Sequence, residues 1–253
     1  MYRSKKLKKF FEIKHYFFSR KNGYSKGLYK GLNCGRGSKD KKENIAKNLE
    51  FVSKKMRVKK NNLILMFQTH SNKVIEINKA SSIKKINSDA MITTKKDIAL
   101  GVVTADCVPI LLFDFRNKII GCIHAGWKGA FSGIIQNTIT KIKKKYLKCK
   151  IYASLGPCIG KKSYEVDENF VNKFLKKSKK NKKYFFRKNN CKQLFDLRSF
   201  VEDQLLSLNV IVDHVNFDTY VENKKFFSFR RSTILKQSDY GRNISVIKLN
   251  LKS

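Results

Sequence analysis

Short apolar runs alternate along the chain with longer segments in which apolar residues recur at helical spacing. Runs that are bounded by turn residues indicate strands, and they occupy 63–67, 73–77, 98–104, 109–113, 119–123 and 150–155, with later runs at 209–215, 226–229 and 244–249. Helical spacing covers 43–56, 130–146 and 196–208, the last with Asp196 in the N-cap position. The alternation predicts the α/β class, with a large mixed β-sheet flanked by helices.

The chain contains no internal repeat and no linker rich in Pro, Gly or Ser. Its 253 residues are near the upper size for one hydrophobic core, so we expect a single catalytic domain over residues 1–253. The one low-complexity stretch, KKSKKNKK at 176–183, continues the polar end of a helical pattern that starts near Asp167. It predicts a lysine-rich surface loop over about 176–192.

The formal net charge of +37 suggests a nucleic-acid or anionic-membrane partner. The distribution of the charge favours another cause. The 46 Lys far outnumber the 10 Arg and are spread over the whole length, whereas a nucleic-acid-binding stripe concentrates its cations and favours Arg. Biased base composition of the gene explains this pattern, so we expect no specific nucleic-acid partner, and an acidic small-molecule substrate remains compatible.

The six Cys, at 34, 107, 122, 149, 158 and 191, lack the regular spacing of a disulfide framework. The first twenty residues have no apolar core of a signal peptide. The most apolar segment, 99–113, is interrupted by Asp106 and Pro109 and is too short to span a bilayer. These features predict a cytoplasmic protein without a membrane partner, and they leave the oligomeric state open.

Three residues with metal-binding side chains end three of the predicted strands. His70 is the last residue of LILMFQTH, Cys107 of IALGVVTADC, and His124 of IIGCIH. Residues at strand ends can converge on one crevice, and two imidazoles with one thiolate fill three positions of a tetrahedral zinc ion, leaving the fourth for water or substrate. The alternative is structural, because a His or Cys in an apolar run is often a core residue.

Seven segments of the chain extend this interpretation: FQTHSNKV (67–74), SDAMIT (88–93), TADCVPILLFD (104–114), GCIHAGWKG (121–129), SLGPCIGKKSYEV (154–166), FFSFRRS (226–232) and GRNISVI (241–247). Together they resemble the multicopper polyphenol oxidase, or laccase-like, family, now described as purine nucleoside phosphorylases with adenosine deaminase and methylthioadenosine phosphorylase activities. The resemblance runs from about Phe18 to Leu249. It implies that His70, Cys107 and His124 are metal ligands and that the substrates are a purine nucleoside and phosphate.

The resemblance also implies two pocket residues near the N-terminus. The segment FFSRKNGYSKGLYKGLNCG is similar to the family's Arg and Asn-rich loop, which makes Arg20 and Asn33 candidates for substrate binding. Two departures are visible: the loop after Asn33 is shortened, and Asp218 stands where many members carry Cys. The first departure affects the rim of the substrate pocket, and the second affects no ligand.

Multicopper oxidase chemistry fits the composition poorly. A multicopper cluster needs many His, and this chain has four, of which His15 and His214 lie outside the motifs. One zinc ion with an open position instead suits hydrolytic attack on C6 of adenosine. We therefore expect Zn²⁺ as the cofactor, with copper as an alternative metal.

Supporting groups flank the ligands. Lys128 and the backbone N–H groups of the GWKG turn can hold phosphate, although the glycines of this turn also serve a tight bend. Asp106, beside Cys107, can orient a ligand, act as a general base or cap the turn. Arg230 and Arg231 are candidates for an anion site or a structural ion pair.

Two other functions remain open from sequence. One is a cysteine hydrolase with Cys107 as nucleophile and His124 as base, acting on a cell-wall precursor. The other is a non-enzymatic module that binds polyanions, supported by the charge alone. Metal content distinguishes the zinc enzyme from the hydrolase, and tight salt-dependent DNA binding without turnover would identify the module.

Overall fold

The computed structural model describes residues 1–79, 86–188 and 192–250. The strands form a six-stranded sheet in the order β12-β8-β6-β7-β4-β3, a four-stranded sheet in the order β1-β13-β5-β2, and a small sheet in the order β10-β11-β9. Their bounds are β1 Ile13–Phe17, β2 Leu63–Leu65, β3 Val74–Glu76, β4 Ala90–Thr93, β5 Ala99–Thr104, β6 Val108–Asp114, β7 Ile119–Ala125, β8 Ile151–Leu155, β9 Glu165–Val166, β10 Phe185–Arg187, β11 Gln193–Phe195, β12 Ile211–His214 and β13 Asn243–Leu249.

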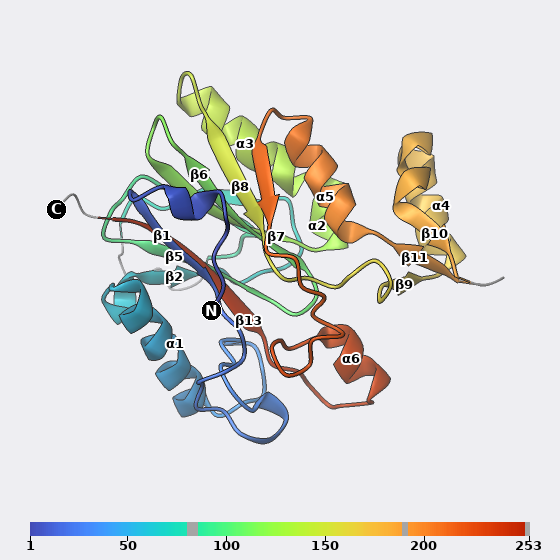
Figure 1. Ribbon diagram of the computed structural model, residues 1–253, viewed down its shortest axis with the longest axis horizontal. Coiled ribbons are helices and arrows are strands. Elements are labelled where there is room, and N and C mark those ends of the chain that lie inside the picture. The colour runs from blue at the N-terminus through green and yellow to red at the C-terminus, as the bar shows by residue number, and fades with distance from the viewer. Residues whose placement is uncertain (80–85, 189–191, 251–253) are drawn as a thin grey trace.

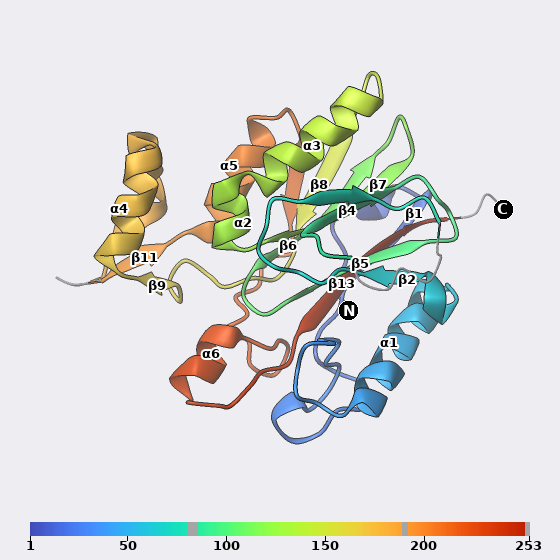
Figure 2. The ribbon, with the colours of Figure 1, turned by 180° about the vertical axis from the view of Figure 1, so that it is seen from behind.

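Helices lie on both sides of the two larger sheets, and another helix lies beside the small sheet (Figure 1). Their bounds are α1 Lys42–Met56, α2 Trp127–Ser132, α3 Ile134–Lys145, α4 Glu168–Lys177, α5 Leu197–Leu206 and α6 Phe229–Ile234, with short 3-10 helices at Leu7–Lys9, Gly27–Tyr29, Lys60–Asn62 and Lys179–Tyr184. Both views place α3 and α5 beside the six-stranded sheet and α1 beside the four-stranded sheet (Figure 2). None of the helices within the described residues combines the length and the apolar character needed to cross a membrane.

Alternation of side chains along the strands divides the interior into layers. On β6, Ile110 and Leu112 pack with helices α3 and α5, whereas Leu111 and Phe113 face the four-stranded sheet. The outer face of the four-stranded sheet is covered by α1, through residues such as Leu49. Because strands buried on both faces read as continuous apolar runs, this layering explains why the central strands were recognisable.

The mixed α/β class with large mixed sheets flanked by helices is confirmed by the structure. The strands are divided between two large sheets rather than gathered in one. Both faces of β6 carry apolar side chains, and the second sheet buries the face that the helices leave uncovered. The N-cap of α5 is Asp196, as predicted, and its carboxylate accepts a hydrogen bond from Ser199 N.

Three predicted elements were wrong in extent or type. The helix expected over 130–146 begins earlier and is broken into α2 and α3 by Gly133, whose φ of +96° is left-handed. The strand expected at 226–229 does not form, because Ser228 is the N-cap of α6 and Phe229 is the first residue of that helix. The lysine-rich segment is less irregular than expected, because it contains the end of α4, the 3-10 helix Lys179–Tyr184 and strand β10, although residues 189–191 lie outside the described residues.

Candidate metal centre

The three sequence-predicted ligands come together. One ligand atom from each of His70, Cys107 and His124 lies within 4.8 Å of the others. The Sγ of Cys107 is 3.7 Å from Nε2 of His70, and the imidazole rings of His70 and His124 are 4.7 Å apart between centroids. Among the described residues, this is the one group of three or more His, Cys, Asp or Glu placed to hold a metal ion.

The ligands come from different kinds of backbone. His124 is buried within β7, and Cys107 lies in the tight connection between β5 and β6. His70 was expected to end a strand, but β2 ends at Leu65, and His70 lies in an exposed loop with a left-handed φ of 58°. The three residues therefore converge, as the strand pattern suggested, whereas the loop conformation of His70 was not visible in that pattern.

A buried carboxylate, which sequence reasoning missed, organises two of the ligands. Asp89, directly before β4, is fully buried. Its carboxylate accepts hydrogen bonds from the backbone N–H of His70 at 3.0 Å and from Nδ1 of His124 at 2.8 Å. It also accepts from the N–H and the hydroxyl of Ser71, at 2.6 and 2.7 Å. These bonds hold the loop of His70 and leave Nε2 of His124 available to a metal.

The electrostatics of the cluster favour charged side chains. Burial alone would raise the pKa of Cys107, but the neighbouring His124 and His70 outweigh it and lower the pKa to about 6. Burial alone would lower the pKa of His124, yet Cys107 and Asp89 raise it to about 9. For Asp89, hydrogen bonds from His124 and Ser71 overcome burial and lower the pKa to about 2. The thiolate, which is the metal-binding form, is thus favoured near neutral pH.

A glycine gives the ligands their space. A Cβ atom at Gly126 would lie 2.7 Å from Cδ2 of His70 and 2.8 Å from Sγ of Cys107, both closer than real contacts allow. Gly126 is the N-cap of α2, which begins at Trp127. The sequence pattern places the start of this helix at Ala130, three residues later. Lys128 is exposed on α2 with its Nζ 5.6 Å from the Trp127 ring, while Trp127 packs against Phe170.

Asp106 connects the Cys107 turn to the segment before α6. The Asp106 carboxylate accepts hydrogen bonds from the hydroxyls of Thr219 and Ser228, at 2.6 and 2.9 Å, and from Arg230 N at 2.7 Å. Burial raises the pKa of Asp106 against the effect of these donors. Of the roles considered from sequence, the geometry matches a cap that holds the turn with its left-handed φ of 83°.

The two arginines after Ser228 differ. The guanidinium of Arg231 donates to the carbonyl oxygens of Thr219, Tyr220 and Phe226, which makes it a backbone clamp rather than one half of an ion pair. Arg230 donates to the carbonyl of Glu165, and its guanidinium lies 5.4 Å from the centroid of the Tyr164 ring. The pKa of Tyr164 is raised by burial and by the charge of Cys107.

The two N-terminal candidates lie in different surroundings. Asn33 is buried, and its side chain donates to Ser38 and Asp40 and accepts from the N–H groups of Gly35 and Arg242. These four hydrogen bonds occupy both the amide nitrogen and the oxygen of the Asn33 side chain, and they hold the loop that follows Asn33.

Arg20 instead lines a cleft of about 1040 Å³ together with Ser228 and Arg231. Its guanidinium lies 4.1 Å from the centroid of the Phe227 ring. Since Ser228 also binds Asp106, this cleft adjoins the turn that carries Cys107.

The comparison with protein families agrees with the motifs. A family model described as multi-copper polyphenol oxidoreductase laccase matches residues 14–250, which include all three candidate ligands. The chain belongs to this family.

Relatives in this laccase family carry another functional name. A protein from Rickettsia conorii named purine nucleoside phosphorylase is 39% identical over 211 residues, covering 81% of this chain and 86% of the relative. One from Bacteroides thetaiotaomicron with the same name is 30% identical over 239 residues, covering 89% of this chain and 88% of the relative. A crystal structure of a Neisseria meningitidis protein of the DUF152 family is similar, with a TM-score of 0.84 and 28% identity over 95% of this chain and 96% of that one.

The laccase family description does not by itself supply a multicopper cluster here. The chain has four His, and the two outside the motifs have other partners. His15 accepts a hydrogen bond from Ser4 N, and His214 bonds Glu202. Among the described residues, the chain therefore has one candidate metal site, formed by His70, Cys107 and His124.

Proposed function

We propose that the protein is a zinc-dependent purine nucleoside phosphorylase that also deaminates adenosine and cleaves methylthioadenosine. The observation that carries the proposal is the convergence of His70, Cys107 and His124, supported by relatives named purine nucleoside phosphorylase. We infer that residues 1–253 form one catalytic domain. The five described Cys are free thiols, which agrees with a reducing compartment and with our proposal of a cytoplasmic location.

The donor set fits zinc. The ligand atoms of a tetrahedral zinc ion lie roughly 3.5 Å apart, and the Sγ of Cys107 is 3.7 Å from Nε2 of His70. The Asp89–His124 pair is the carboxylate–histidine arrangement that fixes a ligand tautomer. When bound, zinc supplies a Lewis acid and lowers the pKa of a coordinated water to about 7. Copper, which imidazole and thiolate also bind, is the alternative metal.

The residues of the chain have separate tasks in this proposal. His70, Cys107 and His124 hold the metal, and exposed His70 leaves the centre accessible to substrate. Asp106 holds the turn of Cys107 against Ser228, at the edge of the cleft that Arg20 lines. We propose that the nucleoside enters through this cleft, with Arg20 as a binding residue, and that Lys128 contacts phosphate. The buried Asn33 then supports the loop and acts on the pocket indirectly.

One substitution tests the centre. Cys107→Ser removes the soft ligand, so protein purified without added metal is expected to lose its zinc, its conversion of adenosine to inosine, and its phosphate-dependent release of adenine and ribose 1-phosphate. Metal analysis and chromatography of the products measure these losses. Cys149→Ser is the matched control, because the Cys149 thiol donates to a carbonyl that a hydroxyl can also reach. Full zinc content and activity in Cys107→Ser would place the site elsewhere.

The lowered pKa of Cys107 favours one competing function, a cysteine hydrolase that acts on a cell-wall precursor. In that mechanism the Cys107 thiolate attacks a carbonyl carbon, the bond to the leaving group breaks as His124 gives that group a proton, and water activated by His124 then hydrolyses the resulting thioester. The same experiment separates the two. If fully metallated wild-type protein releases neither inosine nor a free base from any common purine nucleoside, the hydrolase is the better assignment.

A further inference from the structure

Two lysines face each other at the edge of the four-stranded sheet. Lys14 on β1 is the direct partner of Lys248 on the antiparallel strand β13. Like charges directly opposite in a ladder destabilise the pairing. Lys248 is also only 7% exposed, and lysines are almost never so buried unless they are paired. The sheet therefore contains an electrostatic conflict that burial makes worse.

Two arginines add to this cluster. The guanidinium of Arg3 and the ammonium of Lys14 lie 5.9 and 5.8 Å from the centroid of the same ring, that of Tyr16. Arg57 is the C-cap of α1, and its carbonyl oxygen accepts a long bond of 3.4 Å from the ammonium of Lys248. We call these four residues, Arg3, Lys14, Arg57 and Lys248, the edge cluster.

The edge cluster has no acidic partner among residues 1–79, 86–188 and 192–250, since none of its four cations forms a salt bridge there. The nearby carboxylate of Glu12 is bound to Lys118 at 2.8 Å. Burial lowers the pKa of Lys14, and Arg57, Lys248 and Arg3 lower it further. The repulsion is thus uncompensated within the described chain, and a bound anion would relieve it.

The edge cluster lines a cavity large enough for such an anion. The cavity has a volume of about 1100 Å³, and Tyr16 and Phe11 contribute to its wall. Phe11 is 85% exposed, which leaves its ring free to stack on a ligand. A pocket of this size accommodates a nucleotide-sized molecule.

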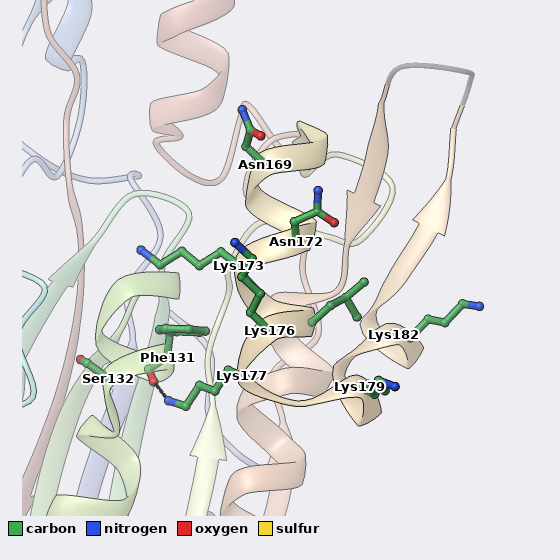
Figure 3. A pocket seen from close by; sticks show the side chains of 10 residues that line it. Phe131, Ser132, Asn169, Asn172, Lys173, Lys176, Lys177, Lys179 and Lys182 are labelled. Atoms are coloured by element: carbon green, nitrogen blue, oxygen red, sulfur yellow. Dashed lines mark hydrogen bonds between the residues drawn. The ribbon is translucent and has the colours of Figure 1, made fainter.

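The lysines around α4 form a contrasting surface. There, Lys173 and Lys182 point in opposite directions, and the ammonium of Lys177 donates to the carbonyl of Phe131 (Figure 3). The lysines that line the pocket on this surface are all exposed and lie on α4 and the 3-10 helix that follows it. Such cations are solvated individually, unlike the half-buried and buried lysines of the edge cluster.

The edge cluster is separate from the metal centre. The first residue of β13, Asn243, donates a side-chain hydrogen bond to the carbonyl of Thr104, close to the turn of Cys107. Lys248 lies five residues farther along β13, at about 3.4 Å per residue. An anion at the edge cluster would therefore occupy a second site rather than the proposed nucleoside cleft.

We propose that the edge cluster binds the di- or triphosphate group of a small-molecule anion. Four convergent cations match a group with several negative charges, and arginine can contact phosphate oxygens with two donors. The shared chemistry is the linked phosphates, whose source is either a nucleoside triphosphate or inorganic polyphosphate. Contact with the ring of Phe11 distinguishes the sources, because only the nucleotide has a base to stack.

Calorimetric titration of the zinc-loaded protein at physiological salt tests this proposal. The probes are ATP, inorganic tripolyphosphate and AMP, and we expect ATP or tripolyphosphate to bind at least about tenfold more tightly than AMP. Lys14→Gln is expected to weaken that binding about tenfold, and Lys248→Met to weaken it similarly. The control pair, Lys179→Gln with Lys182→Gln, removes charge from the contrasting surface and is expected to leave the affinity unchanged.

The thermal midpoint of unfolding is a second readout, which distinguishes lost binding from a folding defect of the variant. Tripolyphosphate should raise the thermal midpoint of wild type and of the control pair, since a ligand of the native state stabilises it, and should do so much less for Lys14→Gln. Tighter binding of ATP than of tripolyphosphate would identify a nucleotide, and equal binding would identify the phosphates alone; both support the site. Equal weakening by the control pair, no binding at physiological salt, or preferential binding of single-stranded DNA would overturn it.

Discussion

Two buried histidines respond to their surroundings in opposite ways. His15 on β1 has no exposed surface, and His124 on β7 is 4% exposed. Burial lowers the pKa of His15 to about 4, assisted by Arg3 and opposed weakly by Asp213. The pKa of His124 is instead raised to about 9, because Cys107 and Asp89 outweigh the same burial.

The difference shows that the partners of a buried imidazole, more than its burial, decide whether it can take part in chemistry. Nε2 of His15 accepts from Ser4 N at 3.0 Å, and Nδ1 has no partner among the described residues. Nδ1 of His124 donates to a carboxylate, and its ring faces a thiol. The first environment suits a neutral core residue, and the second suits a metal ligand or a charged pair.

The largest expected effect concerns the neutral histidine. Its pKa in the unfolded chain is 6.5, above the folded value of about 4, so the unfolded state binds the proton more readily. Stability should therefore be retained above pH 6.5 and fall as the pH drops from 6.5 towards 4, by about 3 kcal/mol. Urea unfolding across this range measures the loss.

The contrast between His15 and His124 attributes this loss of stability at low pH to His15. His15→Gln keeps an acceptor for Ser4 N but cannot be protonated, so this contribution to the loss should disappear. His214→Gln is the matched control, because His214 is partly exposed and bonds Glu202. An unchanged acid limb in His15→Gln would mean that His15 is not the buried neutral group described here.

The next effect concerns the charged histidine. Asp89→Asn replaces the carboxylate that accepts from Nδ1 of His124 and from the His70 loop, and we expect zinc affinity to fall about 10- to 100-fold. Competition with a chelator of known affinity measures it. Asp97→Asn is the control, since Asp97 is exposed and its carboxylate accepts a hydrogen bond from the side chain of Asn62, away from the metal ligands. Unchanged zinc affinity in Asp89→Asn would show that the hydrogen bond from His124 to Asp89 does not contribute to metal binding.

The smallest effect is expected on the lysine-rich surface, where Lys179 and Lys182 are exposed and contact neither histidine. Lys179→Gln with Lys182→Gln removes two exposed charges and should change the free energy of unfolding by less than about 0.5 kcal/mol. Zinc content and nucleoside turnover should also remain at the wild-type level. Urea unfolding and product analysis check both expectations, and a loss of turnover would give these lysines a role that their solvated positions do not support.

The local patterns were sufficient for most elements, whereas the candidate ligands were implied by the resemblance of their motifs to a known family. Strands β5, β6 and β7 are continuous apolar runs because both their faces are buried, which made them visible. The helix break at Gly133 and the left-handed loop of His70 were missed, because a periodic pattern does not report backbone φ. Strand β1 was missed because its sequence, IKHYF, includes a Lys and a His.

The sequence by itself determined the mixed α/β class, the identity of the three candidate ligands and their approximate places at the ends of apolar runs. Only the tertiary structure decided that Asp89 lies against His124, that Gly126 makes room for Cys107, and that Lys14 opposes Lys248. The physical reason is that apolar periodicity is a local property of the chain. The pairing and desolvation of a polar side chain depend on segments that are distant in sequence and that only folding brings together.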